Sequence, residues 1–279
     1  MVNPNPLNAR AIHLRSLHKP GDPLVLCNVY DGATTRIVLK HGGAKALATS
    51  SYAVAAVRGK RDEDLDPDML ISAARDIVNV INEHEASLKS GDGNAGMIPL
   101  TIDMRDGWGD RLEYVVRGLI DAGVVGCNLE DEDAETGKLM SCDEATARVR
   151  RVVKEAERLG VPDFAINART DVLGHGGTID EAICRGKAYL DAGATCVFVW
   201  GGLGGRGVSG PEILKLVEAL DGRLNARLKT GPGYLTIPEL TKMGVARISL
   251  GKELHDIAMM AYKQTVTQFI GAGEVAAPN

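Results

Sequence analysis

Short apolar runs and longer amphipathic segments follow one another eight times along this chain. The apolar runs are rich in aliphatic residues and do not alternate cleanly with polar ones, which is typical of strands covered on both faces. We therefore predict eight buried strands, at residues 24–29, 45–50, 97–103, 126–131, 164–170, 195–200, 223–228 and 246–250.

The segments between these runs have the residue spacing of helices. Residues 66–88 and 141–160 carry apolar side chains three and four positions apart. Ser141 and Glu144 have the spacing of a capping box, and Gly160 is a helix stop. A helix that ends at glycine before a buried strand is the repeating unit of a parallel sheet, so we predict an α/β protein with a (β/α)₈ TIM barrel. The alternative is a doubly wound sheet, but no GxGxxG follows the first strand.

Composition and charge narrow the class of protein. We expect one barrel domain over residues 1–279, with an N-terminal leader and helix at 1–23 and a C-terminal helix and tail at 251–279, because no linker divides the chain. A net charge of −5 with scattered lysine and arginine does not indicate a nucleic-acid partner. The five cysteines form no CxxC pair, and we find neither a signal peptide nor an apolar run of about 20 residues. We therefore expect a cytoplasmic protein without a membrane segment.

The candidate chemistry lies at the carboxyl ends of the predicted strands, where the active site of a TIM barrel is found. Those ends supply several carboxylates, including Asp103 and Glu130, and one arginine, Arg169. Such a set suits a divalent cation that holds an anionic substrate, with Arg169 balancing negative charge that develops during the reaction. The alternative is that these polar residues only cap loops.

Several longer phrases of the sequence follow one another in a familiar order. They are NVYDGATTRIVLKHGGAKALATSSYAVA, GKRD, TIDMRDGWGD, GCNLEDED, FAINARTDV and RGKAYLDAGATCVFV. In these phrases the chain resembles the phosphoenolpyruvate mutase/isocitrate lyase superfamily. The resemblance implies a (β/α)₈ barrel whose last helix is exchanged with a neighbouring subunit. It also implies a small anionic 2-oxo or 2-hydroxy acid as substrate, and Mg²⁺ as cofactor with Mn²⁺ as the alternative.

The resemblance also assigns metal-binding roles. Asp103 matches the principal metal carboxylate of the family, and Glu130 matches the acidic residue that helps to hold the water shell of the metal. Relatives carry a second aspartate two residues after the first, where this chain has Arg105. Asp106 comes next and is expected to reach a metal-bound water. Arg105 either binds a second substrate carboxylate or pairs structurally with Glu130 or Asp133.

Substrate-binding and catalytic roles are carried over in the same way. Ser50 and the following backbone match the segment that binds the carboxylate and oxo oxygen of the substrate, and Asp62 matches an aspartate that contacts metal-bound water or reactant. The implied catalytic residues are Arg169, Asp62 and Ser50. The resemblance implies Ser50, Ser51, Tyr52, Arg169 and Asn225 as substrate-binding residues, and we add Arg105 and Trp200, two positions at which the chain departs from the family.

Besides Arg105, two segments depart from the family pattern. After the fourth strand, isocitrate and methylisocitrate lyases carry lysine, cysteine, glycine and histidine together, whereas this chain reads EDEDAETGKLMSCDEA. Those two activities are therefore disfavoured, and Cys142 is interpreted as a residue at the start of a helix. Trp200 and the GGLGGRG that follows it indicate a different or larger substrate group, or a covered barrel mouth. His175 is interpreted as an ordinary loop residue, with an acid–base role as the alternative.

Three functions remain open at this point. The first is a Mg²⁺-dependent carbon–carbon lyase acting on a small 2-oxo or 2-hydroxy (di)carboxylate through a metal-stabilised enolate. The second is a mutase or hydrolase acting on a P–C bond, and the third is a non-catalytic barrel that binds a ligand or partner. The C-terminal helix has more apolar surface than one barrel face needs, so we expect a homo-oligomer, either a dimer or a tetramer. Its apolar residues are Ile257, Met259, Met260, Val266, Phe269 and Ile270.

Overall fold

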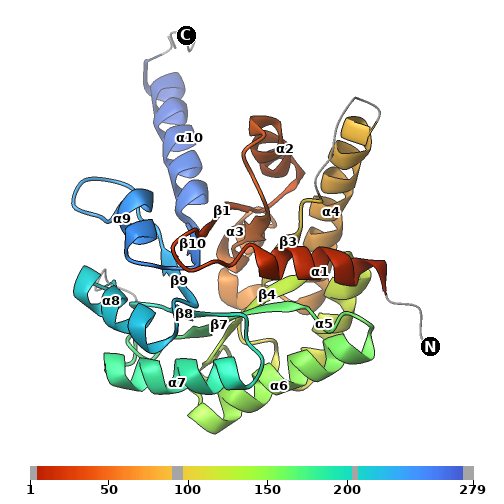
Figure 1. The fold of residues 1–279 in the computed structure, drawn as a ribbon. Helices are drawn as coiled ribbons and strands as arrows, with labels where there is room; N and C mark the ends of the chain where they lie inside the picture. The colour runs from red at the N-terminus through yellow and green to blue at the C-terminus, as the bar shows by residue number, and fades with distance from the viewer. Residues whose placement is uncertain (1–4, 90–96, 203–206, 273–279) are drawn as a thin grey trace.

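Eight parallel strands form a closed barrel in the computed structural model, which describes residues 5–89, 97–202 and 207–272 (Figure 1). The barrel strands are β1 (Leu24–Val29), β2 (Leu47–Thr49), β3 (Leu100–Asp103), β4 (Gly126–Glu130), β7 (Ala165–Thr170), β8 (Cys196–Val199), β9 (Leu224–Arg227) and β10 (Arg247–Ser249). Each strand pairs with its neighbours in chain order, and β1 closes the barrel against β10. The predicted TIM barrel is therefore confirmed.

All eight strands lie within the predicted apolar runs, and most are shorter than predicted. The difference is largest for β2 and β3, whose pairing is limited to Leu47 with Leu100 and Ala48 with Thr101. Asp103, Glu130 and Arg169 lie at or next to the last residues of β3, β4 and β7 and are still paired in the sheet. Ser50 and Trp200 lie just beyond the ends of β2 and β8, so the predicted site residues gather at the carboxyl ends of the strands.

Helices surround the barrel and bury its outer face. They are α2 (Gly32–His41), α4 (Pro67–Lys89), α5 (Leu112–Asp121), α6 (Cys142–Arg158), α7 (Ile179–Asp191), α8 (Gly210–Ala219) and α9 (Ile237–Lys242). The helices predicted at 66–88 and 141–160 correspond to α4 and α6, and Ser141 and Glu144 form the predicted capping box. Among the described helices, we find none that is both long and apolar enough to cross a membrane.

The N-terminal helix α1 (Pro6–Ser16) packs at the end of the barrel where β4 begins. A Cβ atom on Gly126, the first residue of β4, would lie 2.8 Å from Cδ2 of Leu14. The Nδ1–H of His18, just after this helix, donates to the carbonyl oxygen of Leu14 at 2.9 Å. Burial, and secondarily the charge of Arg247 nearby, lower the pKa of His18 to about 3.

Three small elements around the barrel mouth have no counterpart in the sequence predictions. They are α3 (Ser51–Ala56), the 3₁₀ turn η1 (Asp62–Asp64), and an antiparallel hairpin of β5 (Glu132–Asp133) and β6 (Lys138–Leu139). Each is too short to produce a periodic apolar pattern. The hairpin occupies the loop after β4, in which the sequence lacks the lysine–cysteine–glycine–histidine phrase.

The C-terminal helix α10 (Glu253–Ala272) extends away from the barrel, as Figure 1 shows in blue. Most of its predicted apolar residues are exposed, and Ile270 is exposed by 84%. The exposed large apolar side chains on this helix are Ile257, Met259, Met260, Tyr262, Phe269 and Ile270. A run of this kind on one helix marks a surface that normally contacts another apolar surface.

Candidate active site

Asp103 ends β3 and is fixed from several sides. Its Oδ2 accepts a hydrogen bond from the backbone N–H of Ser51 at 3.1 Å, and its own N–H donates to Oγ1 of Thr49 at 3.0 Å. Nδ2 of Asn128 lies 3.5 Å from its Oδ1. Asn128 in turn accepts a hydrogen bond from Nδ2 of Asn167, because the two residues are register partners on β4 and β7. These two asparagines, which lie inside β4 and β7, therefore support one side of Asp103.

Arg169 lies between two carboxylates on its own and the adjacent strand. Its Nη1 donates to Oε1 of Glu130 at 2.5 Å, and its Nη2 and Nε donate to Oδ1 of Asp171 at 2.6 and 2.9 Å. Glu130 and Arg169 are register partners on β4 and β7. Asp171 follows Arg169 by two residues and is completely buried. From the sequence, Asp171 belonged to the strand-end carboxylates but received no catalytic, substrate-binding or metal role, although its two-residue spacing from Arg169 was a usable signal.

Burial is the main cause of the shifted pKa values of the carboxyl groups in this cluster. Removal from solvent raises the pKa of Glu130 well above its usual range, against the opposing charge of Arg169. For the same reason the pKa of Asp171 is raised to about 6. Burial alone would lower the pKa of Arg169, but the charges of Glu130 and Asp171 outweigh it and raise that pKa. Arg169 is therefore a permanent cation between two carboxyl groups that protonate more readily than free ones.

Aromatic rings cover the outer side of Arg169. The guanidinium carbon lies 4.4 Å from the ring centroid of Trp200 and 6.0 Å from that of Phe198, both in or next to β8. Trp200 stands beside a close contact between the loops after β7 and β8. There a Cβ atom on Gly202 would lie 2.8 Å from the Cα of Gly174, so the two backbones can approach only as glycines.

Asp62 and Arg105 face the same centre from neighbouring loops. Burial raises the pKa of Asp62, and the charge of Asp103 raises it further, while the Ser51 side chain, Arg105 and Arg169 lower it. Oδ1 of Asp62 is buried and has no hydrogen-bond partner within the described chain.

Arg105 has a strained backbone and does not have the structural partners that we considered. Its φ of 52° is in the left-handed region, which non-glycine residues rarely adopt. The carboxylates considered as partners have others instead, since Glu130 pairs with Arg169 and Asp133 with Arg148. In the described part of the chain we find no salt bridge of Arg105, and its guanidinium carbon lies 6.0 Å from the Trp108 ring centroid. The structural-pairing interpretation of Arg105 is therefore wrong.

Asp106 is directed away from this centre. It is buried, and its Oδ2 lies 3.3 Å from Nη1 of Arg148, a residue of α6 that also donates to the Asp106 carbonyl at 2.7 Å. The backbone N–H groups of Trp108 and Ala134 donate to its two carboxylate oxygens at 3.2 and 3.4 Å. These contacts fix the turn after β3 to α6 and argue against the expected role of Asp106 at a metal-bound water.

The other predicted residues lie around the mouth. Ser50 is buried directly before α3, whereas Tyr52 is 41% exposed, with the Lys252 ammonium 4.7 Å from its ring centroid. Asn225 is buried and its Nδ2 donates to Oγ of Ser249 at 3.1 Å. Nε2 of His175 lies 2.6 Å from Oε2 of Glu132, a hairpin residue, and no hydrogen bond joins its ring to Asp103, Glu130 or Arg169 among the described residues.

The oxygen atoms of this centre fit a hard cation held largely through water. The described residues bring no three histidine, cysteine, aspartate or glutamate side chains together as a ready-made cage. However, Asp62 and Asp171 each bury one carboxylate oxygen without a hydrogen-bond partner in the described structure. Mg²⁺ keeps several waters and needs few direct protein ligands. Asp103, with other carboxylates nearby, therefore fits such an ion.

Comparisons with known proteins give a consistent relationship. A family model described as phosphoenolpyruvate phosphomutase matches residues 14–270. A Corynebacterium glutamicum protein assigned provisionally as a 2-methylisocitrate lyase is 41% identical over 103 residues, which are 35% of this chain and 33% of that protein. The chain thus matches about a third of the length of this relative and of a second one from the same organism.

Two solved structures match over almost the whole chain. One is a Burkholderia cenocepacia protein assigned provisionally as a phosphonomutase, with 34% identity, a TM-score of 0.79, and coverage of 94% of this chain and 99% of that one. The other is oxaloacetate acetylhydrolase in complex with the product oxalate. It is 26% identical with a TM-score of 0.80, and the match covers 97% of this chain and 90% of that one.

Proposed function

Because the chain belongs to the phosphoenolpyruvate mutase/isocitrate lyase superfamily, we propose that it is a Mg²⁺-dependent lyase that cleaves a carbon–carbon bond of a small 2-oxo or 2-hydroxy (di)carboxylate. The observation that carries this proposal is Arg169, a buried cation held by Glu130 and Asp171 beside Asp103. A fixed cation in a buried site stabilises negative charge that develops on a substrate oxygen.

Asp103 would bind the metal directly, and Glu130 would hold its water shell. When bound, Mg²⁺ or Mn²⁺ supplies Lewis-acid polarisation of the oxo or hydroxy oxygen of the substrate. The Ser51 N–H and Asn128 orient the Asp103 carboxylate, so this ligand needs little rearrangement before it binds. Arg169 keeps one Glu130 oxygen engaged and leaves the other for a water.

The substrate would lie above these groups. Ser50 and the backbone at Ser51 and Tyr52 would bind its first carboxylate, with Asn225 nearby, and Arg105 would bind the second carboxylate of a short dicarboxylate. Arg169 would balance the charge left on the substrate when the carbon–carbon bond breaks. Asp62 has a raised pKa and a buried oxygen without a partner in the described chain, so it is the carboxyl group we propose for proton transfer.

Two neighbours support this substrate class. The oxaloacetate acetylhydrolase structure holds oxalate, a planar dicarboxylate, and the Corynebacterium relative is assigned as a lyase of a substituted isocitrate. The decisive test is calorimetry with Mg²⁺ and oxalate, followed by product analysis with a panel of 2-oxo and 2-hydroxy dicarboxylates. Metal-dependent oxalate binding with release of pyruvate, glyoxylate or a similar fragment supports a lyase. No metal-dependent binding would favour a non-catalytic barrel.

A second candidate is P–C bond chemistry, as a phosphonopyruvate mutase or hydrolase. The observation that favours it is the Burkholderia structure, which covers almost the whole chain and is assigned as a phosphonomutase. Incubation with phosphonopyruvate and Mg²⁺, followed by ³¹P NMR, separates the two candidates. Conversion of the phosphonate signal into a phosphate ester or inorganic phosphate would support the second candidate, and an unchanged spectrum would eliminate it.

We further infer that the protein is a homo-oligomer in which α10 packs on a neighbouring subunit. The support is the exposed apolar side of this helix, which includes Met260, Phe269 and Ile270. Burial of such side chains against a partner contributes about 25 cal/mol per Å² of apolar surface removed from water. A dimer and a tetramer are both compatible with this helix.

A further inference from the structure

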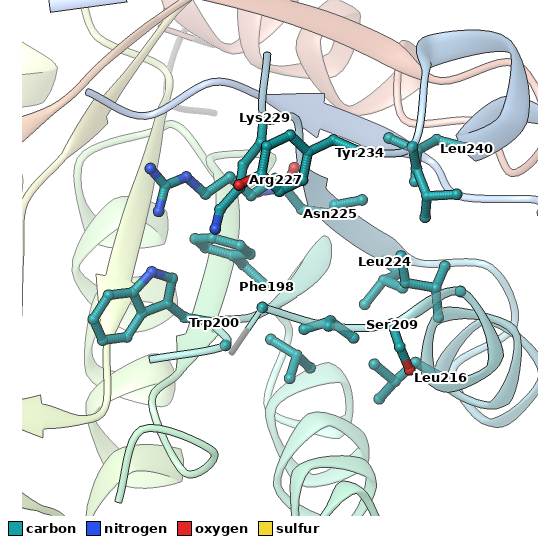
Figure 2. Close-up of a pocket in the computed structure, with 18 of the residues that line it drawn as sticks. Phe198, Trp200, Ser209, Leu216, Leu224, Asn225, Arg227, Lys229, Tyr234 and Leu240 are labelled. Atoms are coloured by element: carbon teal, nitrogen blue, oxygen red, sulfur yellow. The ribbon is translucent and has the colours of Figure 1, made fainter. Parts of the chain in front are cut away.

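A pocket of about 390 Å³ lies beside the proposed active site, between β8, β9, α8 and α9 (Figure 2). Phe198, Trp200 and Asn225 line it. The two rings are those that flank Arg169, so the pocket and the proposed reaction centre share a wall. Its volume is within the range of roughly 300–1,000 Å³ typical of small-molecule sites. The space is thus large enough for a substituent of several carbons.

One side of the pocket is apolar. Ile213, Leu216, Leu224 and Leu240 line this side, and Figure 2 shows the labelled leucines grouped together opposite Trp200. The wall beside them is backbone, since a Cβ atom on Gly201 would lie 2.3 Å from the carbonyl carbon of Gly207. We call this apolar side, formed by Ile213, Leu216, Leu224 and Leu240, the leucine floor. It has no charged side chain and favours a hydrocarbon group.

Two cations, Arg227 and Lys229, line the other side. Nε of Arg227 is buried and has no hydrogen-bond partner in the described structure. Its ion pair with Glu253, at 3.7 Å, is longer than a hydrogen bond. The Lys229 ammonium lies 5.2 Å from the ring centroid of Tyr234. A buried donor without a partner, next to a second cation, is a site that an anionic oxygen would satisfy.

We propose that this pocket is a subsite for the distal arm of the substrate. The arm is an apolar chain that lies on the leucine floor and ends in a carboxylate bound by Arg227 and Lys229. The substrate class is therefore an elongated 2-oxo dicarboxylate, longer than oxalate or oxaloacetate. This inference rests on the proposed function for the position of the reacting end, which lies on the Arg169 side of Trp200.

Calorimetry with the full chain and Mg²⁺ tests the subsite. We expect 2-oxosuberate, with its longer chain, to bind at least about tenfold more tightly than 2-oxoglutarate. Arg227→Gln should bring the ratio of these two affinities close to one, and so should Val208→Phe, which narrows the pocket. The matched charge change Arg36→Gln, on the α2 surface ion pair with Glu83, should leave the ratio as it was. Thermal unfolding verifies that each variant is folded.

A 2-oxo monocarboxylate distinguishes the contribution of the leucine floor from that of the cations Arg227 and Lys229. The 2-oxooctanoate chain reaches the floor but lacks the distal carboxylate, so Arg227→Gln should leave its affinity relative to 2-oxoglutarate unaltered. An affinity that is equal for 2-oxosuberate and 2-oxoglutarate, or weaker for the longer acid, would overturn the subsite even where short acids are turned over.

If neither 2-oxo nor 2-hydroxy acids bind with Mg²⁺, the proposed function fails and the subsite is tested alone. Suberate and octanoate lack the 2-oxo group and need only the pocket. Suberate binding that depends on Arg227 would still support the subsite, and no binding of either acid would overturn it.

Discussion

The guanidinium of Arg169 lies against the indole of Trp200, with 4.4 Å between the guanidinium carbon and the ring centroid. The edges of the same guanidinium donate to Glu130 and Asp171. The cation is therefore restrained in its plane by carboxylates and on one face by an aromatic ring. From the sequence, Trp200 was a departure from the family and a candidate substrate-binding residue, and in the structure its ring also contacts the predicted catalytic residue Arg169.

Replacement of Trp200 should reduce activity without abolishing it. Trp200→Leu removes a cation–π contact in a desolvated site, worth about 2 kcal/mol, so kcat/KM should fall about 10- to 30-fold. Trp200→Phe keeps a ring and should retain most of the activity. Steady-state kinetics on the substrate found by the acid panel check this. Equal activities of the Leu and Phe variants would contradict a supporting role of the ring.

Asp103 and Asp106 should behave differently when each is changed to asparagine. Asp103→Asn should abolish Mg²⁺-dependent oxalate binding, because its carboxylate is the proposed direct ligand. Asp106→Asn should retain that binding but lower the free energy of unfolding by about 3 kcal/mol, because it leaves Arg148 without its buried partner. Calorimetry and chemical denaturation measure the two effects. The opposite pattern would make Asp106 the ligand.

Arg105→Gly should separate stability from recognition. The left-handed backbone of Arg105 costs roughly 1 kcal/mol for a side-chain-bearing residue and little for glycine. Because the entropy cost of glycine offsets about 0.5–1 kcal/mol of this gain, the variant should be at least as stable as the unsubstituted protein, by up to about 0.5 kcal/mol in urea denaturation. If Arg105 binds the second carboxylate of short dicarboxylates, the KM of oxaloacetate-sized acids should rise about tenfold or more. An unchanged KM for these short dicarboxylates would remove Arg105 from the substrate site.

His18 should make the protein sensitive to mild acid. The folded-state pKa of about 3 lies below the unfolded value of 6.5, so the unfolded state binds more protons between these pH values. The stabilisation is complete above pH 6.5 and is lost as the pH falls toward 3. His18→Gln should remove about 1–2 kcal/mol of this pH dependence. Unfolding free energies at neutral pH and near pH 4.5 measure it, with His41→Gln, an exposed position, as the control.

A charge on the exposed side of α10 should dissociate the proposed oligomer. Phe269→Glu places a carboxylate where an apolar side chain is 59% exposed in the protomer, so it would be buried unpaired in an α10 interface. Light scattering after size exclusion should show a smaller species than for the unchanged protein. Leu214→Glu changes a similarly exposed residue of α8 and should have no effect on size. If the protein without substitutions is itself a monomer in this measurement, the inferred homo-oligomer is wrong.

The barrel was predictable because each strand is an apolar run and each helix–turn–strand unit is contiguous in the sequence. Asp103, Glu130 and Arg169 could be placed at one mouth from their positions at strand ends alone. The pairing of Asp106 was not predictable, because its partner Arg148 is 42 residues away on α6. The strained backbone of Arg105 also gave no signal, since left-handed turns are normally indicated by glycine or asparagine.

The contact between Gly174 and Gly202 joins the loop after β7 to the loop after β8. Each loop follows a different strand, yet their backbones meet so closely that a Cβ atom on Gly202 would reach the Cα of Gly174. A Cβ atom on Gly174 would also lie 3.6 Å from Cζ3 of Trp200, so the ring that contacts Arg169 packs against the same glycine pair. A side chain introduced at either glycine should therefore disturb the position of Arg169 without touching the substrate itself.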